Sequence, residues 1–149
     1  MKVLLGMSGG VDSSVAAAIL QKQVIEVIGA TIKTWSSNEC RDEKAKGCCS
    51  IKDVTDARLV AGRLGIPFYV LDLSDDFKET VIDNFVQTYL SGQTPNPCIR
   101  CNNSIKFGTF LQKAKELGCS HVATGHYARI AHDIETNVYA VQEGIDKSK

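Results

Sequence analysis

The sequence lacks an excess of either charge. Its 149 residues include 17 basic and 17 acidic side chains, so the formal net charge is zero. A protein that binds nucleic acid on its own usually carries a positive field, and here such contacts would be local or supplied by another part of the protein. Repeats and low-complexity segments are also missing. The hydrophobic content of 44% is sufficient for the core of one compact domain.

Targeting and membrane signals are missing as well. The first residues enter an apolar run directly, with no basic region or cleavage site, and no apolar stretch approaches the length of a membrane span. We therefore expect a cytoplasmic protein that makes no membrane contact. In such a reducing compartment, the six cysteines predict buried thiols, a metal site or catalysis.

Short apolar runs alternate with segments of helical spacing along the chain. The runs predict strands at residues 2–7, 24–35, 68–73 and 121–124, and a hairpin at 127–134 and 138–141. The helical spacing predicts helices at residues 11–21, 50–64, 75–90 and 103–117. This alternation predicts an α/β fold, in which helices cover both faces of a parallel sheet and ligands bind at the carboxyl ends of the strands.

A glycine-rich turn joins the first predicted strand to the first predicted helix, from Gly6 to Ser14. Glycine lets the backbone approach a phosphate closely, successive N–H groups form an anion-binding nest, and the helix N-terminus adds partial positive charge. The turn has neither the lysine of a Walker A loop nor the glycine spacing of a Rossmann loop. The alternative is a plain turn, where glycine permits a positive φ and Ser or Asp caps the helix.

The run Ser8-Gly9-Gly10-Val11-Asp12-Ser13 resembles the SGGxDS signature of the PP-loop ATP pyrophosphatases, which have an adenine nucleotide alpha hydrolase-like fold. The resemblance implies that ATP is cleaved between its α and β phosphates. Asp12 would help organise Mg²⁺ or hold the loop, and Ser13 and Ser14 would donate to phosphate oxygens. Helix capping is the alternative role of Asp12, and the two roles are compatible. The implied ATP contacts are Gly6, Met7, Ser8, Gly9, Gly10, Val11, Asp12, Ser13, Ile32 and Gly125.

Ile32 departs from the PP-loop pattern. The family usually places a methionine before the lysine that ends the second strand, and here Ile32 precedes Lys33. The implied contact with adenine is therefore a backbone or apolar one.

A second motif, Thr94-Pro95-Asn96-Pro97-Cys98-Ile99-Arg100-Cys101-Asn102, carries a cysteine pair. Two prolines stiffen the approach, and a helix predicted to begin just after Cys101 favours the thiolate there. A thiolate suits a nucleophile or a metal ligand. A buried structural thiol and half of a zinc site are the alternatives.

This second motif resembles that of the tRNA 2-thiouridylases, and residues 105–107 and 123–127 agree with the same family. The resemblance implies that residues 1–149 form the PP-loop catalytic domain, truncated before a tRNA-binding middle domain and a C-terminal barrel. It makes Cys101 the nucleophile that forms a disulfide with a distal persulfide-bearing cysteine. Cys98 matches members proposed to bind an iron–sulfur cluster through Cys98, Cys101 and that distal cysteine. Asn96, Pro97 and Cys98 would face the target base, and Lys149 would contact tRNA.

The implied reaction is the ATP-dependent 2-thiolation of the wobble uridine of tRNA, with sulfur from a donor protein or sulfide. One alternative is another PP-loop adenylating ligase or amidotransferase-type synthetase, and a second is a nucleotide- or metal-binding module without chemistry. The remaining cysteines and histidines are predicted to be structural: Cys40, Cys48 and Cys49 as loop thiols, with a zinc site as the alternative, Cys119 in the core, and His121, His126 and His132 as hydrogen-bonded side chains.

Overall fold

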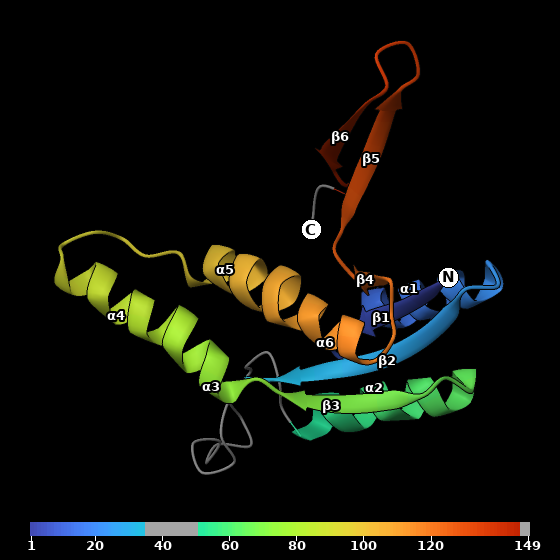
Figure 1. Ribbon diagram of the computed structural model, residues 1–149, viewed down its shortest axis with the longest axis horizontal. Coiled ribbons are helices and arrows are strands. Elements are labelled where there is room, and N and C mark those ends of the chain that lie inside the picture. The colour runs from blue at the N-terminus through green and yellow to red at the C-terminus, as the bar shows by residue number, and fades with distance from the viewer. Residues whose placement is uncertain (35–50, 147–149) are drawn as a thin grey trace.

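The computed structural model describes residues 1–34 and 51–146 (Figure 1). Its main sheet has four parallel strands in the order β3-β2-β1-β4. Their bounds are β1 (Lys2–Gly6), β2 (Glu26–Lys33), β3 (Phe68–Asp72) and β4 (His121–Thr124). The four strands lie within the four predicted apolar runs, so the predicted parallel sheet is confirmed.

Helices cover both faces of this sheet. On one face, α1 (Val11–Lys22) and α2 (Ile51–Leu64) bury Ala17, Ala57 and Ala61 against the strand residues Leu5 and Val27 and against Met7, which follows β1. On the other face, Phe110 and Ala114 of α6 (Phe110–Glu116) pack on Leu4, Ile28 and Ala30. Successive side chains of a strand point to opposite faces, which explains why Leu4 and Leu5 belong to different clusters. The predicted α/β fold is confirmed.

The order of the strands creates a switch point beside β1. The chain proceeds from β1 to β2 and β3 on one side and then returns to place β4 on the other side of β1. At the carboxyl end of β1, Gly6 pairs with Ala30 of β2 and with Thr124 of β4. In open α/β sheets, ligands bind at the carboxyl ends of the strands where the order reverses. The loops after β1 and β4 meet this description.

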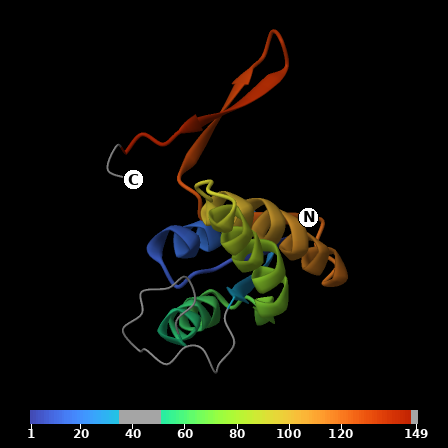
Figure 2. The same cartoon turned by 90° about the vertical axis from the view of Figure 1, so that its left-hand side faces the viewer.

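Two long helical stretches connect β3 to β4. The first consists of α3 (Ser74–Phe77), the π-helical segment η1 (Lys78–Ile82) and α4 (Asp83–Leu90). The second consists of α5 (Pro97–Arg100), the π-helical segment η2 (Cys101–Thr109) and α6. The two stretches lie side by side (Figures 1 and 2) and share a buried cluster of Leu73, Val81 and Ile105.

The second helical stretch, which we call the cysteine helix (residues 97–116), begins six residues earlier than the sequence predicted. The side-chain oxygen of Asn96 accepts a hydrogen bond from the Ile99 amide (3.2 Å), which caps the helix. Pro97 occupies the first helical position, where a missing N–H has no cost. The predicted start at residue 103 was wrong. The prolines Pro95 and Pro97 indicate a break between helices, and this interpretation does not include the role of Pro97 as a first helical residue.

The predicted hairpin is present as β5 (Ala128–Asp133) and β6 (Val138–Glu143), which pair antiparallel. Figure 1 shows this hairpin projecting away from the main sheet. Its turn contains Asn137 with a φ of 54°, a conformation that asparagine tolerates better than most residues. Among residues 1–34 and 51–146, no helix has the length and apolar character needed to span a membrane.

Candidate active site

The glycine-rich turn lies between two helix starts. Gly10 is the N-cap residue of α1, and Gly9 has a φ of +76°, in the left-handed region that favours glycine. A Cβ on Gly9 would lie only 2.6 Å from the carbonyl oxygen of Asp53, in the first turn of α2. The first turn of α2 therefore lies directly against the loop that begins α1. An anion at this turn would meet backbone N–H groups at the N-terminus of a 12-residue helix.

Two serine hydroxyls hold the turn closed. The buried Ser13 hydroxyl donates to the carbonyl oxygen of Gly10 (3.1 Å) and accepts from the amide of Ser8 (3.2 Å). The Ser14 hydroxyl donates to the same carbonyl (2.9 Å). In this structure both hydroxyls therefore donate their hydrogen bonds to the backbone of the turn. Their donation to phosphate oxygens stays a prediction.

The residues predicted to contact ATP in this turn differ in exposure. Met7 is buried in the core, where its amide donates to Ala30 and its carbonyl accepts from the Thr31 hydroxyl (2.7 Å). In contrast, Ser8, Gly10, Val11 and Asp12 are exposed. The solvent-facing surface of the turn is therefore formed by the residues after Met7.

Gly125 lies against the same turn from the other side of the switch point. A Cβ on Gly125 would lie 2.7 Å from the amide nitrogen of Ser13 and 3.0 Å from the carbonyl carbon of Asp12. The structure thus brings Gly125 to the first turn of α1, although the two segments are far apart in sequence. Only a residue without a side chain allows this approach.

His126 follows Gly125 at the end of β4. Its Nδ1 is 2.6 Å from the Thr124 hydroxyl, and its ring lies 6.0 Å from the ring of Phe107 on the cysteine helix. Burial, and secondly the charge of Lys106, lower the pKa of His126 below 6.5. The hydrogen bond to Thr124 is of the kind predicted for this side chain.

The two motif cysteines lie one turn apart on the cysteine helix. Cys98 is exposed, whereas Cys101 is half-buried and packs against the cluster of Leu73, Val81 and Ile105. Ile32, at the end of β2, packs against the same cluster. The candidate adenine contact and the candidate nucleophile therefore border one common group of apolar side chains. Cys119 is buried, which confirms its prediction as a core residue, and burial raises the pKa of its thiol.

The comparisons with known proteins identify the family. A family model described as "tRNA methyl transferase HUP domain" matches residues 1–149. The chain belongs to this family.

Curated relatives of this HUP domain agree with the motifs. The chain is 52% identical over 148 residues to the "tRNA-specific 2-thiouridylase MnmA" of Clostridioides difficile, and this match covers 99% of the chain and 41% of the relative. It is 54% identical over 148 residues to "tRNA-specific 2-thiouridylase MnmA 2" of Clostridium tetani, with the same coverage. The HUP domain thus spans 41% of the length of these relatives. These matches confirm the resemblance to the 2-thiouridylases inferred from the sequence.

Two solved structures share the fold of the HUP domain. A predicted subunit of tRNA methyltransferase from Methanocaldococcus jannaschii superposes with a TM-score of 0.52 at 23% identity, covering 85% of this chain and 53% of that one. An NH3-dependent NAD synthetase from Campylobacter jejuni superposes with a TM-score of 0.51 at 17% identity, covering 80% and 45%. At these identities the similarity establishes the fold alone. The predicted adenine nucleotide alpha hydrolase-like fold is confirmed.

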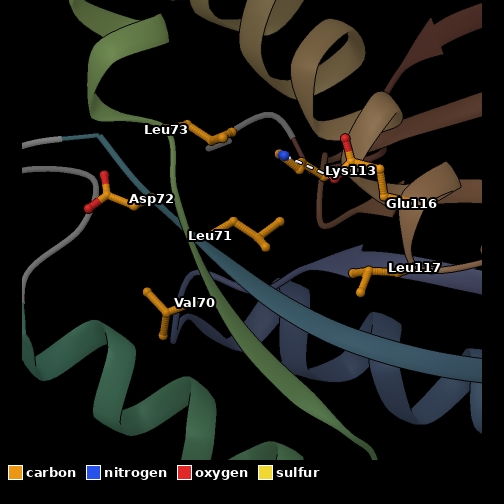
Figure 3. Close-up of a pocket in the computed structure, with 7 residues that line it drawn as sticks. All are labelled: Val70, Leu71, Asp72, Leu73, Lys113, Glu116 and Leu117. Carbon is orange, nitrogen blue, oxygen red and sulfur yellow. Dashed lines mark hydrogen bonds and ion pairs between the residues drawn. The ribbon is translucent and has the colours of Figure 1, made fainter.

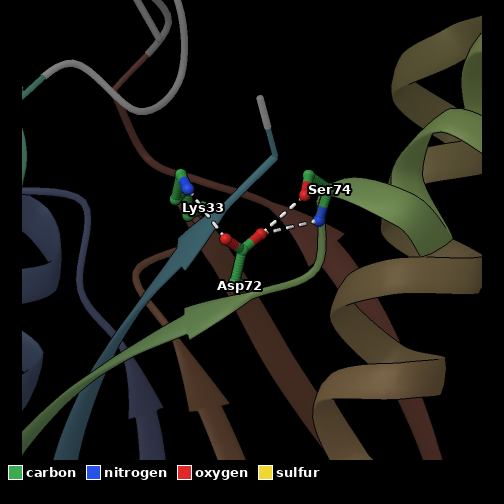
Figure 4. A network of polar contacts seen from close by, with 3 residues as sticks. All are labelled: Lys33, Asp72 and Ser74. Atoms are coloured by element: carbon green, nitrogen blue, oxygen red, sulfur yellow. Dashed lines mark hydrogen bonds and ion pairs between the residues drawn. The ribbon is translucent and has the colours of Figure 1, made fainter. Parts of the chain in front are cut away.

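An ionic network fixes the carboxyl ends of β2 and β3 in the HUP domain (Figure 4). The Lys33 ammonium lies 2.7 Å from Oδ2 of Asp72, and the amide and hydroxyl of Ser74 donate to Oδ1 (3.2 and 2.6 Å). The hydrogen bond from Lys33, followed by those from Ser74, lowers the pKa of Asp72 from 3.8 to about 2. Sequence reasoning missed this network, although an Asp two residues before a Ser at a strand end is a signal for such a turn.

A cavity of about 340 Å³ lies between β3 and α6 (Figure 3). Its charged lining residues have partners: Lys113 pairs with Glu116 (2.9 Å), and Asp72 pairs with Lys33. None of the ATP, cysteine or base contacts predicted from the sequence lines this cavity. The candidate site therefore remains at the turn and the cysteine helix.

The described residues limit which side chains could coordinate a metal ion or a cluster. In residues 1–34 and 51–146, no group of three or more His, Cys, Asp or Glu side chains could hold a metal ion. Cys98 and Cys101 thus supply at most two ligands of a cluster from this part of the chain. Cys40, Cys48, Cys49 and Lys149 lie outside the described residues. For Mg²⁺, the exposed carboxylate of Asp12 in the first turn of α1 is the ligand type that this ion prefers.

Proposed function

We propose that this chain is the ATP-using part of a tRNA 2-thiouridylase. The observation that carries the proposal is the contact of Gly125 with the first turn of α1, which gathers the glycine-rich turn and the end of β4 at the switch point of the sheet. Relatives named as tRNA-specific 2-thiouridylases over 148 residues support the substrate. The whole enzyme would also contain the tRNA-binding middle and C-terminal domains.

The turn is the proposed site for the triphosphate of ATP. Backbone N–H groups around Gly9 and Gly10 would hold the β and γ phosphates, and Asp12 would hold Mg²⁺. Bound Mg²⁺ would neutralise the charge that develops on the leaving pyrophosphate. Ile32 would offer an apolar surface to the adenine, because it is half-buried at the end of β2 beside the cluster that also contacts Cys101.

The proposed reaction has two stages. In the first, the C2 oxygen of the wobble uridine attacks the α phosphorus of ATP, the bond to the β-phosphate oxygen breaks, and pyrophosphate leaves. In the second, a sulfur nucleophile attacks C2 and AMP leaves with the former uridine oxygen. Adenylation thus converts a poor leaving group into a good one.

The cysteine helix is proposed to serve the second stage. With a persulfide on the distal cysteine, the terminal sulfur would attack C2, and Cys101 would then attack the inner sulfur to release 2-thiouridine and form a disulfide. With an iron–sulfur cluster, Cys98 and Cys101 would be ligands and bound sulfide would be the nucleophile. Asn96, Pro97 and Cys98 would face the base, and Lys149 would contact the tRNA. A sulfur donor protein or sulfide would supply the sulfur in the cytoplasm.

The test is pyrophosphate release and 2-thiouridine formation by the full-length enzyme with unmodified tRNA, measured by radiolabel and by nucleoside mass spectrometry. We expect pyrophosphate release to depend on tRNA, and thiolation to require a sulfur source in addition. Replacing tRNA carrying a wobble uridine with tRNA carrying a wobble cytidine is the matched control. Pyrophosphate release that needs ammonia and a small acid, and ignores tRNA, would assign the protein to the amidating synthetases instead.

A further inference from the structure

A side-chain hydrogen bond connects the cysteine motif to the neighbouring helix. Arg100 lies between Cys98 and Cys101 in the sequence, and its Nε donates to Oδ1 of Asn84 on α4 at 3.2 Å. Beyond this bond, the guanidinium makes no hydrogen bond or ion pair with residues 1–34 or 51–146. Asn84 is therefore the one described polar partner of this side chain.

The first turn of the cysteine helix has no buried side chain. No residue of α5 is buried, and Cys98, Ile99 and Arg100 are exposed. The apolar anchoring of this helix starts only at Cys101 and Ile105. The Asn96 cap shapes the turn internally and does not attach it to another element. The first turn also lies beside η1, and the bond from Arg100 to Asn84 is the described side-chain hydrogen bond that joins it to α4.

Asn84 is well suited to anchor the turn. It is half-buried, and its backbone carbonyl oxygen accepts a hydrogen bond from the Thr88 hydroxyl (2.7 Å) within α4. Asn84 and Arg100 both line a cavity of about 380 Å³ between the two helical stretches. The same cavity is lined by Asp83, which pairs with the exposed Lys78 (3.4 Å) without involving the cysteine helix. That ion pair provides a matched control.

We propose that the bond between Asn84 and Arg100 is a positioning contact for sulfur transfer. It fixes the first turn of the cysteine helix on α4, and so determines where Cys98 and Cys101 stand relative to the target base. The proposal rests on the proposed function. Neither residue is catalytic, because both act through the cysteines. An error of about 1 Å in the position of a reacting group lowers a rate by up to about 100-fold.

The experiment uses the full-length enzyme with four substitutions: Asn84→Ala, Asn84→Asp, Arg100→Ala and, as the control, Lys78→Met. We expect Asn84→Ala and Arg100→Ala to slow single-turnover thiolation about 10-fold, while the KM for ATP and tRNA-dependent pyrophosphate release stay within about twofold of wild type. Asn84→Asp should restore most of the rate, because its carboxylate also accepts from Nε. Lys78→Met should behave as wild type.

Iodoacetamide labelling of Cys98 and Cys101, followed by mass spectrometry across pH, gives a readout that does not need turnover. We expect the ratio of the two labelling rates to change in Asn84→Ala and to return in Asn84→Asp, with thermal midpoints close to wild type. Wild-type thiolation and an unchanged labelling ratio in Asn84→Ala would overturn the proposal, as would an Asn84→Asp variant as slow as Asn84→Ala. If the wild-type enzyme does not thiolate tRNA, the proposed function fails. The labelling ratio then tests by itself whether the bond between Asn84 and Arg100 positions the two cysteines.

Discussion

The backbone of Gly125 lies directly against that of Ser13: a Cβ on Gly125 would be 2.7 Å from the Ser13 amide nitrogen and 2.9 Å from its Cα. Both atoms belong to the main chain and cannot rotate away as a flexible side chain would. The end of β4 and the start of α1 are thus in contact.

Gly125→Ala should displace the first turn of α1. We expect a loss of about 1–3 kcal/mol in the free energy of unfolding, because the added methyl group meets backbone, and weaker ATP binding by calorimetry. Gly62→Ala is the matched control. Its Cβ would meet nothing within 4 Å in the interior of α2, so it should stabilise the protein by about 0.5–1 kcal/mol. Equal stability of the two variants would contradict the contact.

Gly9 and Gly10 should respond differently to substitution. Gly9→Ala combines a φ of +76° with a 2.6 Å approach to the Asp53 carbonyl, so we expect a loss of about 2–4 kcal/mol in denaturant unfolding. Gly10 has a φ of −80°, and a Cβ added to it would lie 3.4 Å from the Ser8 hydroxyl oxygen, its nearest neighbour. Gly10→Val should therefore leave the domain folded and abolish ATP binding. A folded Gly10→Val protein with unchanged ATP affinity would remove the turn from the nucleotide site.

Asp72 should make stability depend on acid. Its pKa is lowered from 3.8 to about 2 by Lys33 and Ser74, so its contribution is complete above pH 3.8 and is lost as the pH falls through about 2. Because the pair is partly exposed, we expect Asp72→Asn to cost less than about 1 kcal/mol at pH 7. The difference from wild type should shrink towards zero near pH 2. Urea unfolding at several pH values measures it, and a Lys33→Met/Asp72→Asn double-mutant cycle isolates the pair.

Cys98 and Cys101 can be assigned to one of two sulfur chemistries. If they ligate a cluster, the full-length enzyme should gain iron, sulfide and a visible charge-transfer band after anaerobic reconstitution, and Cys98→Ala should lose all three. If Cys98→Ala keeps full thiolation while Cys101→Ala is inactive, the persulfide route through Cys101 is correct. Normal thiolation by both variants would show that the cysteine helix has no part in the reaction.

The sequence predicted the elements of the fold well, because hydrophobic periodicity and glycine punctuation report local structure. Helix α2 ends at Leu64 before Gly65, whose φ is +66°, and this end was visible as a glycine after the last periodic residue. The start of the cysteine helix was missed for a local reason. Asn96 and Pro97 form a cap and a first helical residue, but the same two residues also favour turns.

Features that depend on packing could not be predicted. The π-helical segments η1 and η2 meet around Val81 and Ile105, and no residue in either segment encodes a wider turn by itself. The hydrogen bond between Asn84 and Arg100 joins two helices, and the hydrophobic periodicity of neither helix indicates it. In contrast, the family resemblance implied that the glycine-rich turn and Gly125 both contact ATP, and the structure brings these two segments together, which periodicity alone would not have suggested.

The wide turns of η2 also make the spacing of its residues significant. Ile105 is fully buried in η2, whereas Cys101 begins the segment and Cys98 precedes it. Deleting a single residue between Cys101 and Ile105 would rotate both cysteines by about 80–100° around the helix axis. Their thiols would then leave the side of the helix that they occupy now, although every cysteine would still be present. The number of residues in this segment therefore determines the positions of the two thiols as much as the identity of those residues does.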